Sequence, residues 1–243
     1  MLSHGKIEIG TILKSWLGRI ASDHPAVRLQ EMGDKLVSAG IYVFLTVQAQ
    51  LLPSPAKSHY TFNLRDLSKV FQGMLMLEVD ALTGSLEQLL RLWYHESCRV
   101  FQDRLVNEDD RIWFENLMFD RFQTTFGMKS EEIIIQRPVL YGDFLLSAAA
   151  DNRKYIEFID NSQASYAIHL YIKLHITVHT VIEENLSDYN QINMAKMNLV
   201  LFMDAIQHIC RISRILRQPQ GNALLLGMGG SGRQSLTRLA AHM

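Results

Sequence analysis

The sequence predicts a mainly α-helical protein with a small α/β element near its C-terminal end. Apolar residues recur at helical intervals over several long stretches, which is typical of amphipathic helices packed around a core. Residues 223–226 form a short apolar run that stops at glycines, and residues 236–241 restart a helical pattern. This order predicts a strand, a tight loop and the first turns of a helix.

Composition excludes several classes of protein. The chain has 243 residues, of which 48% are hydrophobic, so it can bury a core as one large domain or two small ones. A net charge of −1 provides no basic surface for nucleic acid or for an anionic membrane. Apolar runs stay shorter than the ~18 residues of a membrane span, and the N-terminus has no signal-peptide core. We therefore expect a soluble intracellular protein.

The two cysteines, Cys98 and Cys210, both lie within apolar helical patterns. Such positions favour buried, reduced thiols. A count of two also excludes a framework of disulfides.

The N-terminal region predicts helices up to a hinge. Apolar residues at helical spacing predict a helix over residues 7–20, which residues 23–25 (Asp-His-Pro) interrupt. Residues 40–47 are ambiguous, because their β-branched and aromatic residues favour a strand, whereas the apolar pattern that continues beyond them favours a helix. Pro53 and Pro55 then predict a hinge, since a proline disrupts the helical hydrogen bonds and disfavours helical backbone in the residue before it.

Three further helices are predicted after this hinge. The first begins at Asn63 and Asp66, which form a capping pair, and the second is capped by Ser85. The third begins at Asp109 and ends at Gly127. All three carry long apolar stripes, which we interpret as core rather than as a cofactor site.

Adjacent acidic residues invite a hypothesis of general acid and base catalysis. Neighbouring residues on a helix point in different directions, however, so such pairs do not converge on one substrate. We interpret all of them as solvated helix starts or ends. The pairs are Asp109-Asp110, Glu131-Glu132 and Glu183-Glu184.

Two extended pieces are predicted in the second half of the chain. Residues 133–135 (Ile-Ile-Ile) indicate a short extended segment. Residues 168–178 alternate apolar and other side chains, which is a strand signal, although an isolated strand leaves an unpaired edge. On such a strand His169, His175 and His179 would share a face, but they are too widely spaced to bind one zinc ion. We therefore expect no metal site.

The last long helix is predicted over residues 194–216. Arg211, Arg214 and Arg217 gather toward its C-terminal end, where positive charge complements the helix dipole. Pro219 ends this helix and leads to the glycine loop.

The glycine loop fits more than one ligand. Gly227 and Gly232 match the P-loop pattern G-x-x-x-x-G-K-[ST], with Arg233 in place of the lysine and Gln234 in place of the hydroxyl residue. Gly227, Gly229 and Gly232 also match the dinucleotide pattern G-x-G-x-x-G. Glycines turn backbone N–H groups toward one anion at the positive end of the helix dipole, so either phosphate compound is compatible. A purely structural turn remains the third alternative.

A family resemblance chooses among these alternatives. Residues 197–202, residues 205–219 and the loop that follows closely resemble the beginning of the fourth AAA+ module of axonemal dynein heavy chains of the inner-arm type. In that family the loop also reads G-G-S-G-R-Q-S, so the resemblance favours the P-loop. The nucleotide-binding residues that it implies are Gly227, Gly229, Gly230, Ser231, Gly232, Arg233, Gln234 and Ser235.

A second resemblance covers the region after the hinge. The run from Pro53 to Asp66 is similar to the start of the helical lid of the third AAA+ module, and Leu140 to Phe144 also resembles the lid. In AAA+ proteins an arginine called sensor 2 lies at the start of the lid helix and reaches the phosphates, and Arg65 matches it. Its planar fork suits phosphate oxygens. From the residues alone, Arg65 is interpreted as an exposed helix arginine paired with Asp66 or another carboxylate.

The resemblance also implies a division of the chain, and it favours a helix over residues 40–52. Its fold would be a AAA+ helical lid subdomain followed by the first strand, P-loop and helix of the next AAA+ module. The implied parts are residues 1–52 (C-terminal part of the module 3 large subdomain), 53–160 (module 3 lid), 161–193 (a connection with an unmatched insertion) and 194–243 (start of module 4).

By resemblance, the whole protein is an ATP-driven, minus-end-directed microtubule motor that powers ciliary or flagellar beating in the axoneme, within the cytoplasm and cytoskeleton. Its cofactor would be ATP or ADP, with or without Mg²⁺. Its partners would be the remaining AAA+ modules, intermediate and light chains and microtubules, with no nucleic acid and no membrane. The alternative is a non-catalytic helical interaction fragment whose glycine loop stays empty.

We expect no ATP hydrolysis by this chain alone. The sequence ends eleven residues after Gly232, before any acidic strand that could supply a metal-binding carboxylate and a catalytic glutamate. We therefore assign no catalytic residue and no metal ligand.

Overall fold

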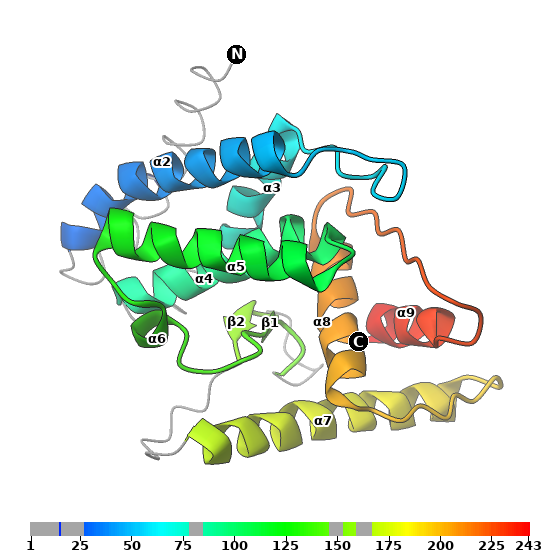
Figure 1. Cartoon of the computed structure of the whole chain (residues 1–243). Helices are drawn as coiled ribbons and strands as arrows, with labels where there is room; N and C mark the ends of the chain where they lie inside the picture. Colours follow the sequence, from blue (N-terminus) through cyan, green and yellow to red (C-terminus); the bar gives the residue numbers. More distant parts are fainter. Residues whose placement is uncertain (1–14, 16–26, 78–84, 146–152, 159–166) are drawn as a thin grey trace. The chain divides into compact units, whose positions relative to one another are not determined.

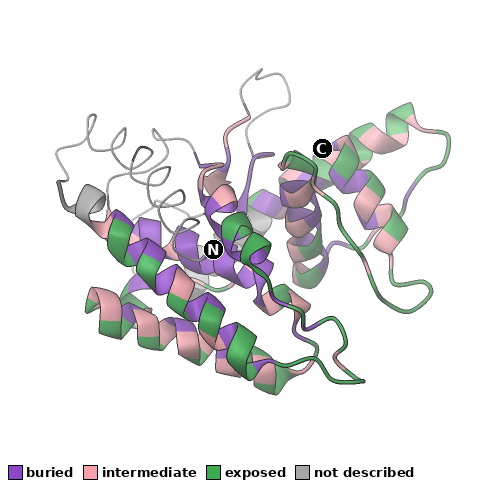
Figure 2. Cartoon of the chain, turned by 90° about the horizontal axis from the view of Figure 1, so that it is seen from above, coloured by how far each residue is buried: buried purple, intermediate pink, exposed green. Residues whose placement is uncertain are grey.

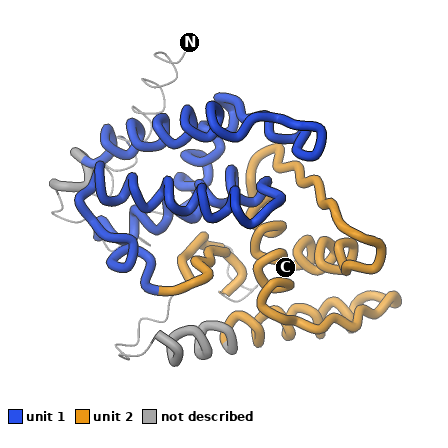
Figure 3. The backbone as a smooth tube through the Cα atoms, viewed as in Figure 1, with its two compact units in different colours: residues 1–135 blue, residues 136–243 orange. Residues whose placement is uncertain are grey.

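The computed structural model describes residue 15 and residues 27–77, 85–145, 153–158 and 167–243. The chain divides into two compact units, residues 1–135 and residues 136–243 (Figure 3). Except for Ser15, which is helical, the predicted helix over residues 7–20 lies outside the described residues, as does its interruption at residues 23–25. None of the described helices is long and apolar enough to cross a membrane.

Unit 1 is built from helices (Figure 1). Among the described residues its elements are α2 (Val27–Gln50), α3 (Leu64–Met74), α4 (Leu86–Val100), the 3₁₀ turn η2 (Gln102–Arg104), α5 (Glu108–Arg121), the π-helical turn η3 (Phe122–Phe126) and α6 (Ser130–Ile133). Helices α3 and α4 pack against each other, and α2 packs against α3 and α5. Buried and exposed residues lie on different faces of the helices (Figure 2).

The ambiguous residues 40–47 are helical, as the family resemblance implied, because they lie within α2. Within this stretch, Gly40 lies where α2 meets α3. A Cβ atom at Gly40 would lie 2.9 Å from Cζ of Phe71, so the glycine lets α3 pack closely against α2. The helix ends at Gln50, and the predicted hinge at Pro53 and Pro55 follows in the non-helical segment.

The predicted caps of unit 1 are confirmed. The side chain of Asn63 accepts the N–H of Arg65 at 2.9 Å, and Asp66 accepts the N–H of Asn63 at 2.9 Å. Ser85 Oγ accepts the N–H of Gln88 at 3.2 Å. Gly127 follows η3 with a φ of +71°, a left-handed conformation that favours glycine.

The core of unit 1 is aromatic. Phe101 packs against Phe62 and Phe114, and Trp93 packs edge-on against Phe122. Such tilted and edge-on pairs are the favoured geometries of aromatic rings. All five rings are buried, and Trp93, Phe101 and Phe122 of the predicted apolar stripes lie in this core.

Both cysteines are free and buried, as predicted. Burial raises the pKa of the Cys98 thiol to about 12. The thiol therefore stays protonated and unreactive at neutral pH, since the thiolate is the reactive form.

The interpretation of the acidic pairs as solvated helix starts or ends holds only in part for two of the three pairs. Asp109 is exposed in the first turn of α5, as predicted, but Asp110 is partly buried; Glu183 and Glu184 are exposed but lie inside a helix. Asp110 accepts hydrogen bonds from Lys57 Nζ at 2.5 Å and from the Tyr60 hydroxyl at 2.7 Å. Partial burial opposes ionisation of Asp110, but these two donors hold its carboxyl pKa below the ordinary value. Glu183 lies inside a long helix rather than at its end, and it pairs with His179.

The extended piece predicted at residues 133–135 is only partly present. Ile133 is the last residue of α6, and the non-helical backbone starts at Ile134. A helix cap explains the difference, because Glu132 accepts the N–H of Lys129 at 3.1 Å and so starts a helical turn just before the isoleucines.

Unit 2 combines a two-stranded sheet with three helices in the part of the chain that the structure describes. Strands β1 (Tyr141–Gly142) and β2 (Ile156–Glu157) pair antiparallel, with Tyr141 opposite Glu157. The helices are α7 (Ala167–Ile192), α8 (Met203–Arg217) and α9 (Arg233–His242). Helices α7, α8 and α9 pack against one another around one apolar core (Figure 1).

The strand predicted over residues 168–178 is wrong, because these residues belong to α7. Farther along α7, Val178 and Ile182 are buried four residues apart, which is helical spacing. On another part of the helix, His179 Nδ1 lies 3.3 Å from Glu183 Oε2. A helix pairs its own backbone groups, whereas a strand here would need a neighbouring strand.

The three histidines therefore share no strand face. Within the described residues, no group of three or more His, Cys, Asp or Glu side chains can hold a metal ion.

The helix predicted over residues 194–216 begins later, at Met203. The side chain of Asn190 explains this difference. Its amide nitrogen donates to the carbonyl of Met197 at 2.9 Å, and its amide oxygen accepts the N–H of Met197 at 2.7 Å. Both backbone groups of Met197 are thus held in a non-helical conformation.

The arginines at the end of α8 are held by specific contacts rather than by the helix dipole alone. Arg217 Nε lies 2.6 Å from the buried carboxylate of Asp143, and Arg217 also donates to the carbonyl of Arg153 at 3.3 Å. Arg214 is buried. These contacts connect α8 to the small sheet and its neighbouring loop.

We predict that Arg104→Ala destabilises unit 1 by about 1–3 kcal/mol, because a buried carboxylate then loses its charged donors. Arg104 binds both carboxylate oxygens of Asp66, at 2.5 and 3.2 Å, and Asp66 is only 3% exposed. Urea unfolding followed by the fluorescence of Trp93 and Trp113 measures the loss.

The matched control is Arg65→Ala. Arg65 lies beside Asp66 but is exposed and forms no ion pair among the described residues, so its change should stay within about 0.5 kcal/mol. Equal effects of the two substitutions would contradict a stabilising role for the Arg104–Asp66 pair.

Candidate functional site

The chain approaches the glycine loop through a turn that requires glycine. The N–H of Gly221 donates to the carbonyl of Gln218 at 2.9 Å, and Gln220 has a φ of +55°. A Cβ atom at Gly221 would lie 1.8 Å from the carbonyl oxygen of Ile215. This turn reverses the chain after α8 and starts the segment that leads to the loop.

The strand predicted over residues 223–226 is not formed, because the sheet of the described residues contains β1 and β2 alone. Leu224, Leu226 and Met228 are 83%, 78% and 86% exposed, whereas Leu225 packs against the core of unit 2. Extended backbone becomes a strand only when a neighbour pairs its N–H and C=O groups. The apolar run predicted a strand, but the sequence did not show whether another segment would pair with it.

Two glycines of the loop adopt left-handed backbone conformations. Gly230 has a φ of +81° and Gly232 a φ of +75°, and Gly232 directly precedes α9 as its N-cap. The N–H of Ser231 donates to the carbonyl of Met228 at 3.3 Å, which closes a tight turn. A Cβ atom at either of these glycines, or at Gly229, would meet no heavy atom within 4 Å. The loop is therefore open in front of the start of α9.

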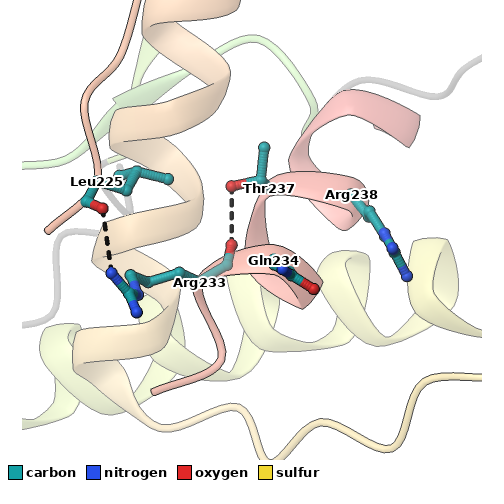
Figure 4. A pocket seen from close by; sticks show the side chains of 5 residues that line it. All are labelled: Leu225, Arg233, Gln234, Thr237 and Arg238. Atoms are coloured by element: carbon teal, nitrogen blue, oxygen red, sulfur yellow. Dashed lines mark hydrogen bonds between the residues drawn. The ribbon is translucent and has the colours of Figure 1, made fainter. Parts of the chain in front are cut away.

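Arg233, which replaces the P-loop lysine, is turned back onto the loop. Its guanidinium donates to the carbonyl of Leu225 at 3.3 Å (Figure 4). It also donates to the carbonyl of Met228 at 3.2 Å. Its own carbonyl accepts the hydroxyl of Thr237 at 2.8 Å. In this structure the arginine thus contacts backbone oxygens on the N-terminal side of the loop.

An open pocket of about 500 Å³ lies beside this arginine. Its lining side chains include two guanidinium groups and no carboxylate, which favours an anionic ligand. The lining residues are Leu225, Arg233, Gln234, Thr237 and Arg238 (Figure 4).

The structure brings the predicted loop residues together around the start of α9. Gln234 and Ser235 follow Arg233 in the first turn of that helix. A Cβ atom at Gly227 would lie 3.2 Å from Ser231 Oγ and 3.4 Å from Arg233 Cδ, so Gly227 provides room for both side chains. Arg65 lies in unit 1 instead, in the first turn of α3, where its side chain is exposed.

The alternative interpretation of Arg65, an exposed helix arginine paired with Asp66 or another carboxylate, is right about its exposure, but the structure shows no such pair among the described residues. Asp66 binds Arg104 and the N–H of Asn63 instead. The arginine that the sequence alone assigned to a carboxylate is therefore left exposed at the start of its helix.

Thr237 and Arg238 were missed as pocket residues by sequence reasoning. A signal was present, because they lie four residues after Arg233 and Gln234, and that spacing places residues on the same face of a helix.

Two parts of the chain match known sequence families. Residues 197–243 match the family described as "P-loop containing dynein motor region D4", and residues 16–111 match the family described as "Dynein heavy chain, ATPase lid domain". The chain is 51% identical to Dynein axonemal heavy chain 1 of Homo sapiens over 96% of its own length. The chain belongs to the axonemal dynein heavy chain family. The P-loop interpretation of the glycine pattern is thus confirmed at the level of the family.

Other dynein heavy chains match over a similar range. Dynein axonemal heavy chain 6 of Homo sapiens is 38% identical over 96% of the chain, and Dynein axonemal heavy chain 12 of Mus musculus is 41% identical over 87%. The chain spans only 5% of the length of the first and 7% of the second, and 5% of axonemal heavy chain 1. It therefore corresponds to a short segment of these dynein heavy chains, as the sequence resemblance implied.

We predict that Gly232→Ala destabilises the loop and the start of α9 by about 1–2 kcal/mol, because a left-handed φ places Cβ too close to the following carbonyl oxygen. Gly229→Ala is the matched control, since Gly229 lies in the same loop without a left-handed φ and with space for a Cβ. Hydrogen exchange of the α9 amides measures the difference. Equal exchange in the two variants would contradict the left-handed turn at Gly232.

Proposed function

We propose that residues 227–235 bind the phosphates of ATP or ADP within an ATP-driven, minus-end-directed dynein motor of cilia or flagella. The observation that carries this proposal is the pair of left-handed glycines at the start of α9, open in front and bordered by guanidinium groups. Glycines in this conformation allow backbone N–H groups to turn toward one anion, and the helix dipole adds positive charge there. The family match to a P-loop motor region supports the same ligand class.

The proposed site residues are those implied by the P-loop pattern. Gly227, Gly229, Gly230, Ser231 and Gly232 form the cradle, and Arg233, Gln234 and Ser235 start the helix. Arg65 is proposed as the sensor 2 arginine of the preceding module. Its exposed position at a capped helix start supports that role, since the side chain is free to reach a phosphate.

We propose the same division into modules that the resemblance implied. Residues 1–52 would end the large subdomain of module 3, residues 53–160 would form its lid, and residues 194–243 would begin module 4. Residues 161–193 would connect them. The two family matches, over residues 16–111 and 197–243, lie on either side of residues 161–193 and so support a connection there. The lid match begins at residue 16, within the part proposed as the end of the large subdomain.

The partners proposed for the whole protein are the remaining AAA+ modules, intermediate and light chains and microtubules, in the axoneme. The names of the relatives, which are axonemal dynein heavy chains, support the axonemal location, and the partners follow from the family resemblance. A motor of this kind converts ATP hydrolysis in its AAA+ ring into movement, and the present segment contributes part of that ring.

One observation favours a second candidate, a non-catalytic interaction fragment. Leu224, Leu226 and Met228 are highly exposed on the segment before the loop. Exposed apolar side chains on unpaired extended backbone favour association with another chain or segment.

Equilibrium binding of ATP and ADP to the purified chain, with and without Mg²⁺, tests the proposal. We predict saturable binding that Gly232→Val abolishes, because valine cannot adopt the left-handed turn of the cradle. Gly127→Val is the matched control, since Gly127 has a similar φ of +71° but lies in unit 1. The control should lose stability and keep binding.

Absence of binding by a folded chain would overturn the nucleotide proposal and favour the interaction fragment. Binding that survives in Gly232→Val would show that the nucleotide occupies another place on the chain.

We also predict that this chain releases no more phosphate from ATP than the Gly232→Val variant does. Gln234 offers only an amide oxygen where a P-loop offers a hydroxyl to Mg²⁺, so the metal ion is poorly held. Phosphate release measured over hours provides the comparison. Steady release that the variant abolishes would contradict the prediction.

A further inference from the structure

The guanidinium of Arg233 joins two separate parts of the polypeptide. One acceptor, the carbonyl of Leu225, belongs to the extended segment before the loop, and the other, the carbonyl of Met228, belongs to the turn of the loop. The distances are 3.3 and 3.2 Å. A single side chain at the start of α9 therefore holds the loop from its C-terminal side.

Both acceptors are well placed to hold the loop. Leu225 is the residue of the extended segment that packs against the core of unit 2, so its carbonyl lies on anchored backbone. The carbonyl of Met228 also accepts the N–H of Ser231, which uses its second lone pair and fixes the turn. Arg233 thus connects the anchored segment at Leu225, as drawn in Figure 4, to the turn of the loop at Met228.

Arginine suits this task better than lysine does. Its donors form a rigid planar fork that can bind two oxygens at once, whereas the lysine ammonium is a compact charge on a flexible stem. Gly227 leaves room for the arginine, because a Cβ atom there would lie 3.4 Å from Arg233 Cδ and 3.6 Å from Arg233 Nε.

We propose that Arg233 is a positioning residue that clamps the glycine loop in its open shape, and that it does not contact the terminal phosphate of a bound nucleotide. This role rests on the proposed nucleotide site and concerns Arg233, which stands where the P-loop pattern has a lysine. The site then contacts the phosphates that ADP and ATP share, through the loop backbone. It therefore binds ADP and ATP with similar affinity.

A bound phosphate and the backbone carbonyls of the loop would compete for the guanidinium of Arg233. In the usual P-loop the lysine reaches the β- and γ-phosphates. To do the same, the guanidinium of Arg233 would have to leave the carbonyls of Leu225 and Met228, and both groups would lose a charged donor. The loop would lose its connection to the core at the moment when its shape is needed.

The first test uses the nucleotide-free chain and so does not depend on the proposed ligand. We predict that Arg233→Ala and Arg233→Lys each raise hydrogen exchange of the amides of residues 225–232 about tenfold, since each loses the two-oxygen clamp. Arg238→Ala is the matched control, because Arg238 lines the same pocket but is exposed and lies one helical turn farther along. Unchanged exchange in Arg233→Ala, or full protection in Arg233→Lys, would overturn the clamp.

The second test separates a clamp from a phosphate ligand. For a clamp, Arg233→Lys weakens ADP and ATP binding by the same factor, about tenfold, and the ratio of the two affinities stays near one. For a phosphate ligand, lysine would preserve binding, and Arg233→Ala would weaken ATP more than ADP. Either of those last two results overturns the proposal.

Failure of the proposed function is distinguishable from failure of the clamp. If the unchanged chain binds neither nucleotide, the nucleotide site is refuted, while the exchange measurement still decides whether Arg233 holds the loop.

Discussion

The left-handed turn at Gly232 is the feature that couples the packing of unit 2 to its candidate site. The chain runs without regular secondary structure from Gly221 to the loop, and it enters α9 through a φ of +75° that favours glycine. Only after this turn can Leu236 and Leu239 pack into the core shared with α7 and α8. The same turn places the start of α9, with its dipole, behind the glycine loop. The φ angle of Gly232 therefore affects both the packing of α9 in the core and the position of the glycine loop at the start of that helix.

Unit 1 depends on polar contacts at its connections as much as on its aromatic core. Acidic side chains of its helices bind basic residues that are distant in sequence. Asp66 caps its own helix and binds Arg104, while Asp110 binds Lys57 across the connection that follows α2. An anion that is both hydrogen-bonded and paired is stable in a partly buried site. These contacts fix the start of α3, where Arg65 is displayed.

The sequence predicted local features well where one residue type carries the physical reason. The capping pair at Asn63, the cap at Ser85 and the left-handed end at Gly127 all follow from side chains or backbone freedom within a few residues. Periodicity was weaker evidence. Residues 168–178 alternate like a strand yet lie in α7, because a lone strand has no partner for its backbone groups. Residues 223–226 were also predicted to form a strand, but no described segment pairs with their backbone groups, so they form none.

The order of residues along the chain was sufficient to identify the family, the glycine pattern of the loop and the residues that start α9. The folded arrangement was needed to establish where the arginines point. Arg233 matches the position of a phosphate-binding lysine, but it binds the carbonyls of Leu225 and Met228 because the fold brings those oxygens within its reach. Asp66 binds Arg104, which is distant in sequence, and not its neighbour Arg65. A long arginine side chain can reach several different acceptors, and the fold determines which acceptors lie within its reach.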